Sequence, residues 1–122
     1  MIMTKDDLKL YLKADKYALE RKRDKPSFGD VIWKYEILLR KAEYYFNNRG
    51  GGVNKLLSFY YRHRKDLLGV KLGFSIPLNV ADMGLSIAHI GPIIINSGAH
   101  IGRYCRIHVG VNIGTELGFN DH

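Results

Sequence analysis

The chain has 122 residues, 46% of them hydrophobic and 25% charged, and this balance indicates a globular protein and excludes a disordered one. Its formal net charge of +7 favours an anionic partner: a phosphorylated cofactor, nucleic acid, an acidic glycan or an anionic membrane surface. The single cysteine excludes an internal disulfide, and the first residues lack the apolar core of a secretory signal. No stretch approaches the ~20 apolar residues of a membrane span. We therefore expect a soluble cytoplasmic protein.

The first predicted element is a short amphipathic helix near the start of the chain. Thr4 can cap it, and Asp6 and Asp7 follow in the first turn, where negative charge suits the helix dipole. The break Lys25-Pro26-Ser27 separates this helix from the next. The apolar residues at helical spacing are Leu8, Tyr11 and Leu12.

Two further helices are predicted before residue 70. Asp30 is the expected cap of the second, and Gly50-Gly51-Gly52 ends it. The third runs from about Val53 to Leu68 and carries basic residues near its end, where they suit the dipole. The expected apolar stripe of the second helix includes Trp33, Ile37 and Tyr44, and that of the third includes Leu56, Leu57, Tyr60 and Tyr61.

Between residues 95 and 113 the chain places an isoleucine at every sixth position. The series is Ile95, Ile101, Ile107 and Ile113. A period of six fits a short strand followed by a corner, with one large apolar side chain per unit pointing inward, and three such units make a triangular coil of about 18 residues. The predicted fold class is therefore α + β: N-terminal helices over 1–69, then an incomplete left-handed parallel β-helix of about two coils over 70–122.

A family resemblance lies in the stretch from Ile76 to Thr115, IPLNVADMGLSIAHIGPIIINSGAHIGRYCRIHVGVNIGT. It resembles the hexapeptide-repeat acyltransferases, and more closely their serine acetyltransferase branch, which includes relatives encoded in polysaccharide gene clusters. The resemblance covers about a third of the chain. It implies a left-handed β-helix, a homotrimer, and transfer of an acetyl group from acetyl-CoA to a hydroxyl acceptor.

The resemblance also implies roles for individual residues. His89 stands where the family holds the general base that takes a proton from the acceptor hydroxyl, and an imidazole can accept and return a proton near neutral pH. Asn112, Gly114 and Thr115 stand where the family's backbone begins to approach acetyl-CoA. His108 is a lesser candidate, because in coils of about 18 residues it would lie near His89.

The sequence departs from the serine acetyltransferase pattern at three points. The aspartate that orients the histidine in that branch is replaced by Phe74, and the acidic residue that commonly precedes the histidine is replaced by Ala88. A second active-site histidine would lie downstream of the last residue, so we expect the chain to be a C-terminally shortened version. The departures favour a sugar hydroxyl of a surface polysaccharide as acceptor. The alternatives are serine O-acetylation and an inactive assembly or binding protein.

Two other functions compete with acetyl transfer. His89, His100 and His108 could suggest a metal site, but no carboxylate or cysteine group accompanies them, so we expect no metal. The basic clusters 21–23 and 62–65 could follow a phosphate backbone, yet such charges more often form a solvated helix face, so we expect no nucleic-acid partner.

Overall fold

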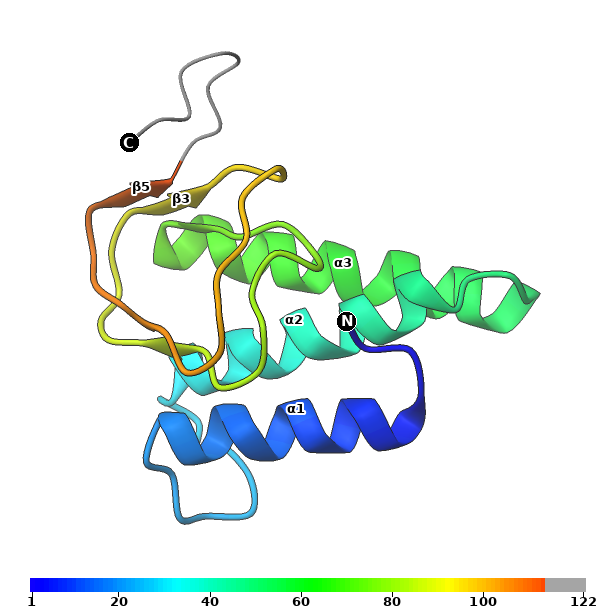
Figure 1. Ribbon diagram of the computed structural model, residues 1–122, viewed down its shortest axis with the longest axis horizontal. Helices are drawn as coiled ribbons and strands as arrows, with labels where there is room; N and C mark the ends of the chain where they lie inside the picture. The colour runs from blue at the N-terminus through cyan, green and yellow to red at the C-terminus, as the bar shows by residue number, and fades with distance from the viewer. Residues whose placement is uncertain (114–122) are drawn as a thin grey trace.

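Three helices form the first part of the molecule in the computed structural model, which describes residues 1–113. They are α1 (Lys5–Ala18), α2 (Val31–Asn47) and α3 (Gly52–Leu72). Helix α2 lies between the other two, and the strand-containing segment covers one end of the helical layer (Figure 1). Within this part of the chain, no helix is long and apolar enough to cross a membrane.

The start of α1 is confirmed, whereas the expected cap of α2 is only half right. The Thr4 hydroxyl accepts a hydrogen bond from the Asp7 amide at 3.0 Å, and the Asp7 carboxylate accepts from the Thr4 amide at 3.1 Å, which makes a capping box. Asp30 does occupy the N-cap of α2, but its side chain makes no cap bond there. Its carboxylate instead accepts two hydrogen bonds from Arg21 at 2.7 and 3.0 Å.

Helix α3 differs from its prediction in both length and orientation. It continues to Leu72, so the boundary expected after residue 69 falls inside it, and it ends at Gly73, whose φ of +85° favours glycine. Its buried positions include Ser58, Lys65 and Gly69, while Leu56 is exposed. At Gly69 a Cβ atom would lie 2.6 Å from the Phe74 carbonyl oxygen. The glycine at 69 thus lets α3 approach its neighbours closely. Of the expected apolar stripe, Leu57 and Tyr61 are half-buried, whereas Leu56 and Tyr60 are exposed.

Five short parallel strands follow α3. They are β1 (Phe74–Ser75), β2 (Ser86–Ile87), β3 (Ile93–Ile95), β4 (Arg106–Ile107) and β5 (Val111–Ile113). One sheet has the order β1-β3-β5 and the other pairs β2 with β4. A single bridge joins Ala81 to Ile101. Paired residues are 19 apart between β1 and β3, 18 apart between β3 and β5, and 20 apart between β2 and β4.

The predicted left-handed β-helix is wrong: the described residues contain three helices and short parallel strand pairs, with no closed or solenoid sheet. The physical reason lies in the first turn, where backbone amides that could pair with a neighbouring strand bond to helix side chains instead. The Asn79 amide donates to Glu43, and the Gly84 and Leu85 amides donate to Asp15. Helices and strands therefore share polar contacts that a solenoid would keep within its sheets.

The buried isoleucines, by contrast, are confirmed. Ile95, Ile101 and Ile107 are at most 5% exposed, as an inward-pointing residue at every sixth position requires. They belong to one apolar cluster that extends into α2 through Tyr35 and Leu39. The helices and the strand segment consequently share a single core. At about 25 cal/mol per Å² of apolar surface removed from water, burial of such side chains is the main stabilising contribution.

Candidate active site

His89 lies two residues after β2, on an exposed corner whose backbone is held on both sides. The amide of Ala88 donates to the Ile107 carbonyl at 2.8 Å, and the amide of Gly91 donates to the Leu72 carbonyl at 3.0 Å. These bonds tie the corner to β4 and to the end of α3. The imidazole is thus presented to solvent from a fixed backbone, which suits a group that must meet a diffusing substrate.

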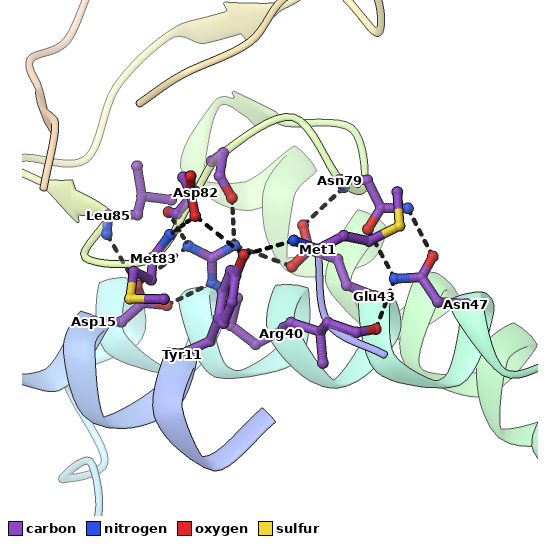
Figure 2. Close-up of polar contacts among 12 residues, drawn as sticks. Met1, Tyr11, Asp15, Arg40, Glu43, Asn47, Asn79, Asp82, Met83 and Leu85 are labelled. Atoms are coloured by element: carbon purple, nitrogen blue, oxygen red, sulfur yellow. Dashed lines mark hydrogen bonds and ion pairs between the residues drawn. The ribbon is translucent and has the colours of Figure 1, made fainter. Parts of the chain in front are cut away.

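A buried ion cluster centred on Arg40 of α2 anchors the segment that leads to this corner (Figure 2). The fully buried guanidinium donates to Asp15 of α1 at 2.7 and 3.2 Å and to Glu43 at 3.0 Å. It also donates to the backbone carbonyls of Ala81 and Asp82, each at 2.7 Å. Burial alone would lower the pKa of Arg40, but the Glu43 and Asp15 carboxylates raise it above its ordinary value. The guanidinium therefore stays charged and joins α1, α2 and the strand segment.

Tyr11 extends this cluster toward the N-terminus. Its hydroxyl donates to Asp82 at 3.1 Å and accepts from the terminal amine of Met1 at 2.8 Å (Figure 2). Burial and the hydrogen bond to Asp82 raise the pKa of Tyr11 to about 12. The hydroxyl thus keeps its proton at neutral pH and serves as a structural donor.

Glu36 of α2 is a buried carboxylate that bonds to the backbone just before His89. One oxygen accepts from the Ile87 amide at 3.1 Å, two residues before the histidine, and the other oxygen has no hydrogen-bond partner in the described part of the chain. Burial, together with the nearby Asp15 carboxylate, raises the pKa of Glu36 well above its ordinary value. This carboxyl holds the strand before His89 at a cost in desolvation.

We expect Glu36→Gln to stabilise the protein at pH 7–8 by about 1–3 kcal/mol, because the amide keeps the acceptor for Ile87 without a buried charge. The folded pKa of Glu36 lies above its ordinary value of 4.5, so above pH 4.5 the folded state binds more protons than the unfolded state. The free energy of unfolding therefore falls as pH rises from 4.5 toward the folded pKa of Glu36, by up to about 1.4 kcal/mol per pH unit. The variant has no carboxyl at this position and lacks this pH dependence.

Urea unfolding at a series of pH values measures this effect as the difference between variant and wild type. Glu20→Gln is the matched control, because Glu20 is an exposed carboxylate and the charge change is the same. Equal behaviour of the two variants across the series would refute the role given to Glu36.

The remaining residues expected at the site are separated from His89 or lie outside the described range. Phe74 is buried, with its ring 5.1 Å from that of Tyr35 in an edge-to-face contact, so it belongs to the core. Asn112 lies in β5 opposite Ile94, one sheet away from β2. Gly114 and Thr115, the other expected acetyl-CoA contacts, lie outside the described residues.

The three histidines of the strand segment occupy different places. The register of β2 and β4 places Ile107 opposite Ile87. Continued by one residue, this register places His108 opposite Ala88, the residue before His89. The spacing here is 20 residues, not the 18 used in the prediction. His100 lines a separate small cavity of about 220 Å³ with Asp82. Among residues 1–113, no group of three histidine, cysteine, aspartate or glutamate side chains is placed to hold a metal ion.

The buried ion cluster around Arg40 is not among the features predicted from the sequence. Glu36, Arg40 and Glu43 are spaced four and three residues apart, which puts them on one face of a helix. That spacing is a detectable signal, but the same pattern is common on solvated helix faces. Asp15, from another helix, carries no local sign of its pairing with Arg40.

Comparisons with known proteins add no identification: no family model, no curated protein and no solved structure matches the chain.

Proposed function

We propose that the chain is an acetyl-CoA-dependent O-acetyltransferase that uses His89 as general base on a hydroxyl acceptor. The observation that carries the proposal is the exposed imidazole on a corner fixed by hydrogen bonds on both sides, within the segment that resembles the acyltransferases. A general base must be accessible to its substrate and held in position, and this corner meets both requirements.

The proposed reaction needs one proton carrier and no covalent enzyme intermediate. His89 accepts the proton of the acceptor hydroxyl while the hydroxyl oxygen attacks the thioester carbonyl of acetyl-CoA. The C–S bond then breaks, the acetyl ester forms, and the imidazolium returns its proton to the sulfur of coenzyme A. The exposed guanidinium of Arg106, on the strand paired with β2, supplies a cation suited to the phosphates of the donor.

A sugar hydroxyl is the proposed acceptor. Recognition of free serine needs a charged partner for its amine, and the position that carries the aspartate in the serine-specific branch holds the buried Phe74 here. The residue before the histidine is Ala88, which also offers no charge. A neutral sugar needs no charged partner, so the absence of acidic residues at these two positions favours a sugar over serine as acceptor.

The first test is the binding of acetyl-CoA to the purified protein, measured as a change in the unfolding temperature. A ligand that binds only the folded form stabilises it, by about 2.7 kcal/mol at a concentration 100 times its Kd. We expect acetyl-CoA to raise the unfolding temperature and to be consumed when a sugar acceptor is added. ATP is the matched control, because the basic chain attracts any anionic nucleotide. A shift no larger than that produced by ATP contradicts the proposal.

A further inference from the structure

The outward face of α3 carries six large hydrophobic side chains. They are between 49% and 82% exposed, whereas the buried positions of the helix are Ser58, Lys65, Gly69 and Leu72. The exposed set is Val53, Leu56, Phe59, Tyr60, Leu67 and Val70. Leu56 lies three residues from both Val53 and Phe59 and four from Tyr60, Leu67 follows Tyr60 after two helical turns, and Val70 lies three residues beyond Leu67, so all six share one side of the helix. At 1.5 Å per residue the 21-residue helix is about 32 Å long, and the stripe runs along most of it.

Positive charge flanks this stripe. The exposed Lys55, Arg64 and Lys71 lie beside it, and the one carboxylate of α3, Asp66, pairs with Lys65 at 3.2 Å. No other cation of α3 forms an ion pair within residues 1–113. Long cationic side chains beside an apolar stripe can reach past it to anionic groups while their stems stay on the apolar surface.

A basic groove continues this surface toward α2. The groove has a volume of about 1230 Å³ and shares Arg64, Leu67 and Lys71 with the outward side of α3. Seven of the side chains that line it are lysine or arginine, and one, Asp24, is a carboxylate. On its edge the ring of Phe28 is 96% exposed, with the Lys34 ammonium 5.1 Å from the ring centre. The groove therefore adds both positive charge and exposed apolar surface to the same side of the molecule.

We propose that the outward face of α3, with this groove, binds an anionic membrane surface and lies flat in its interface. A long helix with an apolar stripe between cationic flanks is the arrangement that combines burial among lipid chains with attraction to phosphate head groups. A second copy of the chain fits less well, because pairing the same face with itself brings cations against cations.

Co-sedimentation of the whole protein with vesicles tests the proposal. We expect binding to vesicles of equal parts phosphatidylglycerol and phosphatidylcholine, weaker binding as salt is added, and little binding to pure phosphatidylcholine. Leu56→Gln or Leu67→Gln should weaken binding about tenfold by removing apolar burial. Lys55→Gln or Lys71→Gln should weaken it about fivefold each.

Matched substitutions on α1 separate a specific face from general stickiness. Leu10 is 50% exposed, close to the 54% of Leu67, and Lys9 is exposed. Leu10→Gln and Lys9→Gln should leave binding unchanged. All these positions are exposed, so the variants should keep the wild-type circular dichroism and unfolding temperature.

Three outcomes overturn the proposal. The first is no binding to the anionic vesicles, and the second is equal loss of binding in the α1 and α3 variants. The third is a concentration-dependent dimer that Leu56→Gln abolishes in a protein that does not bind vesicles, which would assign the face to a second copy of the chain.

Discussion

Arg40→Met is expected to destabilise the protein by about 3–5 kcal/mol, because it leaves two buried carboxylates without their cation. Asp15 and Glu43 are each 2% exposed and both pair with Arg40. The substitution also removes the donors to the carbonyls of Ala81 and Asp82, so the strand segment loses its attachment to α2. The free energy of unfolding in urea measures the loss.

Arg21→Met is the matched control for this prediction. Arg21 also forms a short ion pair, with Asp30 at 2.7 Å, but its side chain is 32% exposed and solvent screens the pair. We expect it to cost less than about 1 kcal/mol. A second comparison adds Asp15→Asn to Arg40→Met, which should recover part of the stability by removing one uncompensated charge. Equal losses for Arg40→Met and Arg21→Met would show that the cluster is not the anchor described above.

The helices could be predicted because their signals are local. Thr4 and Asp7 are close in sequence, so the capping box is readable from the residues themselves. The six-residue spacing of isoleucine likewise predicts which side chains turn inward, and Ile95, Ile101 and Ile107 are buried. The first result needs only residues three apart and the second only the period of the pattern, so neither needs knowledge of the rest of the chain.

The β-helix prediction failed because the sheet contacts depend on residues far away in the sequence. The Gly84 and Leu85 amides reach Asp15, 69 and 70 residues earlier, and the Ile87 amide reaches Glu36. The six-residue repeat of the strand segment contains no signal for these helix partners. The same limit applies to α3, where Leu56 and Tyr60 of the expected apolar stripe are exposed, while Ser58 is buried and Gly69 lies against Phe74 of β1 and Tyr35 of α2.

At the candidate site, the family resemblance predicts His89, but the sequence does not predict the surroundings of this residue. His89 follows from the family resemblance, and its exposure on a held corner suits the proposed role. The contribution of Glu36 could not be predicted, because it acts through the Ile87 backbone amide and no motif marks it. The strand that leads into the corner is therefore held partly by a buried side chain on α2, outside the segment that carries the resemblance.

His89→Ala is expected to lower the rate of acetyl transfer by about 10²- to 10⁴-fold, the range that a positioned general base contributes. The imidazole is exposed, so its removal should change the free energy of unfolding by no more than about 0.5 kcal/mol. Acetyl-CoA should still raise the unfolding temperature of the variant, because the base acts on the acceptor hydroxyl. Release of free coenzyme A in the presence of a sugar acceptor measures the rate.

His100→Ala is the matched control, because His100 is also exposed and lies in the same segment, but it lines a small cavity that does not include His89. It should retain the wild-type rate. His108→Ala tests which of two neighbouring histidines is the base. A loss of rate much smaller than that of His89→Ala assigns the base to His89, after β2, whereas a larger loss assigns it to His108, after β4. If His89→Ala transfers acetyl groups as fast as His100→Ala, the histidine is not the base, even where acetyl-CoA binds. Because binding and rate are measured separately, this result would reject His89 as the general base without rejecting acetyl-CoA as the acetyl donor.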